Sequence, residues 1–200
     1  MATGRKASPK RAKPHRAVAG DTESRLVEAA LSLADRQGWR RTTLTDIARE
    51  AGLSLADLHA QLRSRGAILS ACLRHFDQIA LAGPPADKDE KPKDRLFDLL
   101  MRRFEALKPH RKAVRSMAWD SIGDPAALLA LRRVLISMGW MLEAAGVPTA
   151  GLPGLAKRRV LALAYLSVLV VFLRDDSKDL GKTMAALDHR LSLIGPFLGL

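Results

Sequence analysis

The sequence predicts an all-α protein of about nine helices. Apolar residues recur three and four positions apart along most of the chain, which is the spacing of one helix face. Pro and Gly residues separate these segments, and no segment alternates apolar and polar residues as a half-buried strand would. The 200 residues, 48% of them hydrophobic and 27% charged, suffice for a small N-terminal unit and a larger helical body.

A first helix is expected to begin at Asp21 or Thr22, either of which can cap it, and to end near Gly38. Its apolar face comprises Leu26, Ala30, Leu33 and Ala34. Residues 1–20 contain two prolines and no apolar pattern, so we expect a disordered tail. Its six basic side chains are Arg5, Lys6, Lys10, Arg11, Lys13 and Arg16, and it has no acidic one.

This tail carries half of the net charge of +12, whereas residues 21–66 contain seven basic and seven acidic groups. A basic tail can lie along phosphates or enter a minor groove of DNA. It can also be a solubilising extension. If the neutral N-terminal unit (residues 21–66) binds a polyanion, the tail is expected to help it.

Two short helices joined by a tight turn are expected next, between residues 43 and 69. Thr43 precedes Asp46 by three residues and Ser54 precedes Asp57 by three, which is the spacing of two capping boxes. Gly52 lies where the first helix must end in a left-handed residue, and a side chain there would crowd the next helix. The helices would pack through Ile47, Ala48, Leu53, Leu58 and Leu62. This outline is that of a helix-turn-helix, in which the start of the second helix is free to face a groove of DNA.

The segment from Thr43 to Ser54 resembles the DNA-binding signature of the TetR family of bacterial repressors. The resemblance implies nine helices, three in the N-terminal unit and six in the body (residues 67–200), which would bind an effector and dimerise. It also implies that the helix after Ser54 enters the major groove. The residues expected to contact DNA are Arg40, Arg41, Thr43, Ser54, Leu55, Ala56, His59, Arg63 and Arg65.

Beyond Ser54 the chain departs from the TetR pattern. The family usually has glycine where this chain has Ala56, and its two aromatic phosphate contacts are replaced by His59 and Gln61. Arg65 stands where the family often has a phosphate-binding lysine. His59 could bond a phosphate or a base edge, or be a solvated surface histidine. Asp57 fits helix capping, although a hydrogen-bond acceptor at that position can also bind the amino group of a cytosine.

The rest of the chain predicts six further helices. Ser64 opens a helix that ends before Gly83 and links the N-terminal unit to the body. Apolar spacing from Leu96 to Leu107 marks the next helix, and Lys108 begins another. Further helices are expected from residue 124 to about 146, after a loop at residues 148–154, and from about residue 180.

Residues 160–173 are apolar on nearly every side, so a helix there must be covered all round. One side can meet the body and the other a second copy of the chain. Four residues of the last helix would join this interface: Leu187, Leu191, Ile194 and Phe197. We expect a homodimer through the last two helices; the alternative is the central helix of a monomer.

A second resemblance covers the C-terminal part of the chain. Its pieces are Lys157-Arg158, Tyr165, Asp176-Ser177 and the segment from Leu187 to Leu191. They resemble the ubiquinone-biosynthesis accessory protein family, which has a TetR-like fold. The resemblance implies binding of lipids, including isoprenoids, rather than gene regulation. The terminal amphipathic helix with which mitochondrial members bind membranes is not evident here.

Both resemblances imply an apolar cavity in the body. Methionine and aromatic side chains are suitable walls, although at helical spacing they also fit a plain core. The candidates are Phe104, Met117, Trp119, Met138, Trp140, Met141, Tyr165 and Phe172. Few polar side chains fall on these faces, so a small apolar or amphipathic ligand is expected.

Other classes of function find little support. The sequence has no glycine-rich phosphate loop, serine elbow, catalytic carboxylate pair or zinc-ligand spacing, so no enzyme, cofactor or metal is expected. The single cysteine, Cys72, fits a buried hydrophobic position in a reducing cytoplasm. No signal peptide is evident, and the longest apolar run, of 14 residues at 160–173, is shorter than the roughly 20 that span a bilayer, so no integral membrane association is expected.

The predicted function is a ligand-responsive regulator of TetR type, most simply a repressor. Ligand entry would shift the helix after Ser64 like a pendulum and move the two recognition helices of a dimer out of register with operator DNA. The alternative is a lipid- or isoprenoid-binding accessory protein with the same fold and a non-functional DNA reader.

Overall fold

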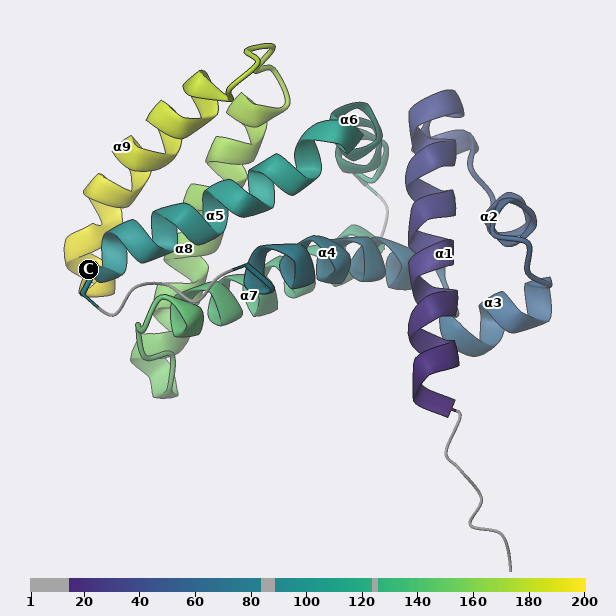
Figure 1. Cartoon of the computed structure of the whole chain (residues 1–200), viewed down its shortest axis with the longest axis horizontal. Helices are drawn as coiled ribbons and strands as arrows, with labels where there is room; N and C mark the ends of the chain where they lie inside the picture. The colour runs from purple at the N-terminus through teal and green to yellow at the C-terminus, as the bar shows by residue number, and fades with distance from the viewer. Residues whose placement is uncertain (1–14, 84–88, 124–125) are drawn as a thin grey trace, which may run out of the picture.

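The computed structural model of the protein describes residues 15–83, 89–123 and 126–200. Within these ranges the chain forms nine α-helices, two short 3-10 helices and no strand, so the predicted all-α fold is confirmed (Figure 1). The elements are α1 (His15–Gln37), η1 (Trp39–Arg41), α2 (Leu44–Glu50), α3 (Leu55–Gln61), α4 (Arg65–Leu81), α5 (Pro92–Leu107), η2 (Lys108–His110), α6 (Arg111–Asp120), α7 (Ala126–Ala144), α8 (Gly151–Phe172) and α9 (Gly181–Leu198).

Three helix starts differ from the prediction. α1 begins at His15, before the expected cap at Asp21 or Thr22, so residues 15–20 of the predicted disordered tail are helical. The rest of that tail lies outside the described residues. A 3-10 turn precedes α6, and α8 begins at Gly151 inside the predicted loop. Pro153 did not prevent this earlier start because proline is tolerated in the first turn of a helix.

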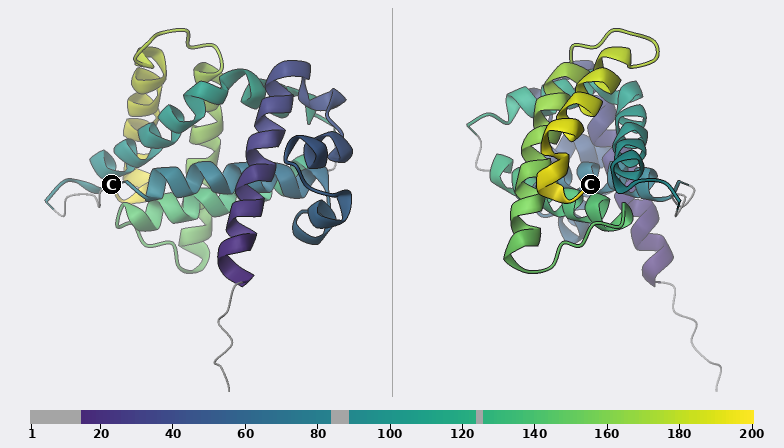
Figure 2. Two further views of the ribbon diagram at one scale, coloured as in Figure 1. Left: turned by 45° about the vertical axis from the view of Figure 1, so that its right-hand side comes forward. Right: turned by 90° about the vertical axis from the view of Figure 1, so that its left-hand side faces the viewer.

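The long helices place the N-terminal unit beside the body. Figure 1 shows α1 standing across the molecule, with α2 and α3 on one side of it and the other long helices on the opposite side. α4 leaves the N-terminal unit and runs along α7 inside the body. α8 and α9 pair with each other, as the right-hand view in Figure 2 shows. α4 is therefore the helix that belongs to both parts of the chain.

A buried polar cluster anchors α4 to its neighbours. Asp77 of α4 accepts hydrogen bonds from Arg103 Nε of α5 at 3.0 Å and from Arg133 Nη2 of α7 at 2.8 Å. Ser137 Oγ donates to the same carboxylate at 2.5 Å, and Arg103 also donates to the Tyr165 hydroxyl of α8. Breaking such a pair leaves an uncompensated buried charge, which costs about 3–5 kcal/mol. The cluster therefore fixes the C-terminal half of α4 within the body.

The exposed face of α8 and α9 differs in part from the predicted interface. Leu187 and Leu191 are fully buried within the chain itself, so they cannot contact a second copy. Leu193 and Phe197 lie on the accessible side of α9, and Leu163 lies on that of α8. The prediction was wrong for Leu187 and Leu191 because apolar spacing identifies one face of α9 but does not say whether the same chain or a second copy covers it.

Within the described ranges, no helix combines the length and the apolar character that crossing a membrane requires.

Candidate DNA interface and ligand cavity

Both predicted capping boxes are present. The backbone N–H of Asp46 donates to Thr43 Oγ1, and the backbone N–H of Thr43 donates to Asp46 Oδ2, each at 3.1 Å. Ser54 and Asp57 repeat the arrangement with the same two distances of 3.1 Å. The hydrogen bonds from Thr43 and Ser54 hold the pKa of Asp46 and of Asp57 below the ordinary value of an aspartate. These carboxylates are therefore committed to starting α2 and α3.

Gly52 forms the turn between α2 and α3 in a left-handed conformation, with φ of +65°. The N–H of the next residue, Leu53, donates back to the Ala48 carbonyl at 2.9 Å, which closes the end of α2. A Cβ at Gly52 would lie 3.1 Å from Arg25 Nη2 of α1. The crowding that was expected from α3 thus comes from α1, whose Arg25 donates to the Ala51 carbonyl.

α3 presents the residues that were predicted to read DNA. Leu58 and Leu62 are buried against the rest of the N-terminal unit, so the opposite face of the helix is open. Leu55 is 51% exposed, although it is a large apolar side chain. Ala56 and His59 are also exposed. This face is the one that a helix-turn-helix inserts into the major groove.

The predicted phosphate contacts divide into two groups. Arg40, Arg41 and Arg63 are exposed. Arg65 is partly buried, donates from Nη2 to the Trp39 carbonyl at 2.7 Å, and lies over the Trp39 ring at 4.7 Å from its centroid. The three exposed arginines are thus available to a phosphate backbone, whereas Arg65 joins the start of α4 to η1.

α6 holds η1 from the side of the body. The backbone N–H of Trp39 donates to Ser116 Oγ at 2.6 Å, and that of Arg40 donates to Asp120 Oδ2 at 3.0 Å. Ser116 Oγ in turn donates to the Asp120 carboxylate at 2.9 Å. The bond from Arg40 is the largest of the causes that lower the pKa of Asp120 below its ordinary value. These contacts, which we name the α6 latch, connect the body to the segment just before the α2 cap.

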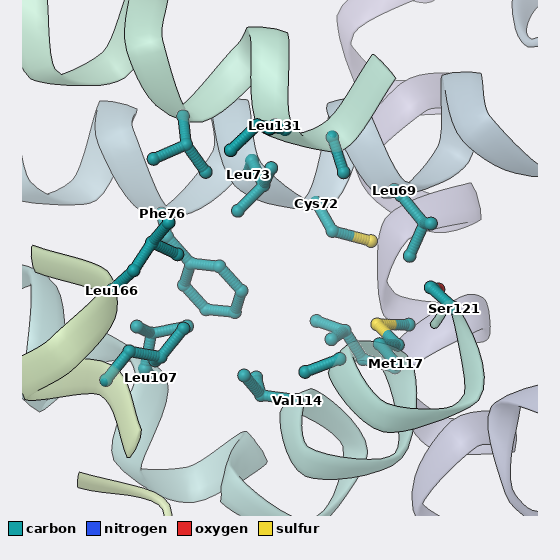
Figure 3. Close-up of a pocket in the computed structure, with 15 residues that line it drawn as sticks. Leu69, Cys72, Leu73, Phe76, Leu107, Val114, Met117, Ser121, Leu131 and Leu166 are labelled. Atoms are coloured by element: carbon teal, nitrogen blue, oxygen red, sulfur yellow. The ribbon is translucent and has the colours of Figure 1, made fainter. Parts of the chain in front are cut away.

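The body contains an apolar cavity of about 260 Å³, close to the lower end of ligand-pocket sizes (Figure 3). α4 and α6 supply much of its wall. Figure 3 shows Leu69, Cys72, Leu73, Phe76, Leu107, Val114, Met117, Ser121, Leu131 and Leu166 around it; Leu31, Ala118, Ala130, Val134 and Leu169 complete the lining. Burial raises the pKa of the Cys72 thiol to about 12, so this wall carries no charge at neutral pH.

Of the eight residues predicted to contact a ligand, Met117 lines this cavity. Trp119 and Trp140 are 48% and 58% exposed on the outside of the body. The other five are buried elsewhere in the core: Phe104, Met138, Met141, Tyr165 and Phe172. Phe104, for example, stacks on Tyr165 with ring centroids 5.2 Å apart. This cavity therefore contains one of the eight predicted residues, and the remaining seven do not line it.

Among the described residues, no group of three or more His, Cys, Asp or Glu side chains is arranged to hold a metal ion.

The family model described as "Bacterial regulatory proteins, tetR family" matches residues 26–72, from the middle of α1 into α4. The resemblance to the TetR family is confirmed. The HTH-type transcriptional repressor KstR2 of Mycobacterium tuberculosis is 33% identical over 102 residues, which are 48% of this chain and 51% of KstR2. The match thus spans about half the length of this curated relative.

Solved structures of TetR regulators share the fold. The TetR transcriptional regulator from Nitrosomonas europaea superposes with a TM-score of 0.69 at 23% identity, over 86% of this chain and 97% of that one. FadR from Thermus thermophilus, a TetR family repressor solved in complex with lauroyl-CoA, gives a TM-score of 0.53 at 20% identity, over 86% and 92%. At these identities the likeness establishes the all-α architecture.

The second predicted resemblance is also confirmed. A family model described as "COQ9" matches residues 141–197, from the end of α7 almost to the end of α9. The two family models therefore cover different parts of the chain. The TetR model covers the helix-turn-helix, and the COQ9 model covers the helices that were predicted to dimerise.

Proposed function

We propose that this protein is a ligand-responsive, DNA-binding transcriptional regulator of TetR type that acts as a repressor and not as an enzyme. The observation that carries the proposal is the accessible face of α3, set by two capping boxes and a left-handed Gly52. Leu55, Ala56 and His59 lie on that face, with exposed arginines at both flanks. The match of residues 26–72 to the TetR model and the similarity to the repressor KstR2 support it.

Sequence recognition would depend on α3, and affinity on the arginines. Leu55 would contact a thymine methyl group, and His59 would bond a base edge or a phosphate. Arg40, Arg41 and Arg63 would bind phosphates, which position a protein without reading sequence. Arg65 would act indirectly by holding Trp39 and η1 in place.

The protein would bind its operator as a homodimer. A two-fold symmetric pair presents two α3 helices to half-sites one helical turn apart. The accessible apolar side chains of α8 and α9 are suited to a contact between copies, since large exposed apolar patches mark interaction sites. Leu163, Leu193 and Phe197 are the residues we assign to that contact.

A ligand in the cavity would act through α4 and α6, which supply much of its wall. Met117 faces the cavity, while Ser116 and Asp120 on the same helix hold η1. Any displacement of α6 would thus reach η1 and the N-cap of α2. A ligand that binds the displaced arrangement more tightly would release the operator; without that difference in affinity it could not act.

The experiment is selection of duplexes from a random pool by the purified protein. We expect enrichment of an inverted repeat whose half-sites are one helical turn apart. His59→Ala should change the selected sequence, whereas Arg63→Ala should reduce recovery and leave the sequence the same. Recovery of no preferred sequence by the wild-type protein would refute the proposal.

A second candidate is a lipid- or isoprenoid-binding accessory protein that has kept the helix-turn-helix only for folding. The match of the COQ9 model to residues 141–197 favours it. On this view α3 keeps its caps and buried leucines but has lost its DNA contacts, as the replacement of both aromatic positions by His59 and Gln61 suggests. Failure of the selection would move this candidate to first place.

A further inference from the structure

The cavity wall contains one polar group that the fold leaves without a partner. Ser121 caps the C-terminal end of α6 and lines the cavity, and its side chain is 6% exposed. Its hydroxyl oxygen is buried and forms no hydrogen bond with any described residue. A buried hydroxyl without a partner destabilises the folded state, because it has lost its hydrogen bonds to water. Native proteins retain such groups where they have a use.

Water is a poor partner for this hydroxyl. A buried water needs two to four polar neighbours. Among the side chains that line the cavity, only that of Ser121 contains an oxygen or nitrogen atom, while those of Cys72 and Met117 contain sulfur. The thiol of Cys72 is protonated and is a weak hydrogen-bonding group. The site therefore offers one good hydrogen bond in apolar surroundings.

The buried charged cluster of the body is used elsewhere. Asp77, Arg103 and Arg133 are on helices that line the cavity but do not line it themselves. Both arginines donate hydrogen bonds to the Asp77 carboxylate. No lining side chain is ionised at neutral pH. An anionic head group would thus enter the wall uncompensated, which is strongly unfavourable.

We propose that the cavity binds a neutral, mainly hydrocarbon molecule with a single hydroxyl or carbonyl group, and that the Ser121 hydroxyl bonds that group. The proposal refines the ligand of the regulator proposed above and rests on it for its biological meaning. Figure 3 places Ser121 with Met117 and Leu69 at one end of the cavity, away from Leu166. The polar group of the ligand would lie at that end, and its hydrocarbon would extend toward Phe76 and Leu107.

The location also gives the polar group a purpose. Ser121 follows directly after Asp120, whose carboxylate holds Arg40 in the α6 latch. A hydrogen bond at Ser121 therefore acts on the end of α6 that contacts η1. Apolar contacts alone would fill the cavity without fixing that end of the helix.

The test uses the DNA-free protein with methyl-labelled methionine and three probes: 1-octanol, octanoate and octane. Binding in the cavity should shift the Met117 methyl resonance, whereas Met184, exposed on α9, serves as the control. We expect Ser121→Ala to weaken 1-octanol about three- to tenfold and to leave octane within a factor of about two. Octanoate at pH 8 should bind about a hundredfold more weakly than 1-octanol, or not at all.

A second readout separates recognition from a structural role. Because Ser121→Ala removes a hydroxyl without a partner, it should raise the thermal midpoint of the ligand-free protein. Ser167→Ala is the matched control, since that hydroxyl already donates to the Ala164 carbonyl at 2.7 Å and does not line the cavity. It should leave 1-octanol binding unchanged.

Three results would overturn the proposal: no shift of Met117 with any probe, octanoate binding as tightly as 1-octanol, or equal loss of all probes in the Ser121 variant. A lower thermal midpoint for Ser121→Ala would assign the hydroxyl a structural role instead. Since no DNA is present, the outcome is independent of whether α3 reads an operator. Failure of the duplex selection would leave this test intact.

Discussion

Replacing Arg65 by alanine should destabilise the N-terminal unit more than it removes a DNA contact. In the structure, the guanidinium of Arg65 bonds the Trp39 carbonyl at 2.7 Å and covers the Trp39 ring at 4.7 Å. Trp39 is itself almost fully buried, between α1 and α6. The substitution therefore removes two interactions from one contact between α4 and η1.

The magnitude follows from those two interactions. A hydrogen bond to a charged group contributes about 1.5–3 kcal/mol, and a cation–π contact at a partly exposed site about 0.5–1 kcal/mol. Because Arg65 is only partly buried, we take the lower part of the sum, a loss of about 2 kcal/mol. For a chain of this size that corresponds to a fall of about 4–8 °C in the thermal midpoint.

The assay is chemical denaturation followed by circular dichroism and tryptophan fluorescence. Arg63→Ala is the control, because Arg63 is exposed and its loss should change stability by no more than about 0.5 kcal/mol. Arg65→Lys should be intermediate, since lysine keeps the charge but not the planar contact with the ring. A loss below about 0.5 kcal/mol for Arg65→Ala would show that Arg65 is not structural and would return it to the phosphate contacts.

Three further predictions concern the latch, a buried carboxylate and the turn. Asp120→Ala should reduce the effect of a cavity ligand on operator affinity, measured by fluorescence anisotropy with and without ligand; an unchanged effect would exclude the α6 latch as the route. Asp175 is buried, and four hydrogen bonds from Ser177 and Thr183 outweigh the effect of burial and hold its pKa well below the ordinary value. The stabilisation that Asp175 provides is therefore present above about pH 4 and is lost as the pH falls through the lowered pKa. Asp175→Asn should therefore make the free energy of unfolding depend less on pH at acidic pH. The same pH dependence in the variant and the wild-type protein would contradict this. Gly52→Ala should cost about 1–2 kcal/mol in urea denaturation because φ is +65°, and a neutral result would mean that the turn can relax.

The helix-turn-helix was predictable because its signals are local. Thr43, Ser54 and their partners three residues later define two helix starts without reference to the rest of the chain. The apolar spacing of α3 then fixed which side is buried, so the accessible positions of Leu55 and His59 followed. The start of α1 was not predictable in this way, since Asp21 is a good cap that the longer helix simply passes through.

The cavity could not be predicted because its wall comes from helices far apart in the sequence. The prediction chose large aromatic residues, and Trp119 and Trp140 lie outside while Phe104 fills the core. Helices such as α7 and α8 are apolar on several sides, so periodicity does not say which side faces a cavity. The apolar residues of α4, such as Leu69 and Cys72, were the available signal, but Cys72 was predicted only to be buried.

The role of Arg65 was missed for a related reason. Its position in the sequence matches a phosphate contact of the TetR family, and nothing nearby in the sequence indicates that Trp39 lies beneath it. The bond is between α4 and η1, which only the packing of α1 and α6 brings together. Local sequence signals gave the helices, and the tertiary contacts decided which arginines remain available to DNA.

The central claim is that α3 reads a specific DNA sequence, and one titration tests it most directly. The protein is titrated into a fluorescent duplex from the DNA upstream of its own gene and into a scrambled duplex, over a series of salt concentrations. The account predicts a preference of about a thousandfold or more for the upstream duplex, with an affinity that falls steeply with salt. Equal, weak binding to both duplexes would show that only non-specific charge is at work and would contradict the account.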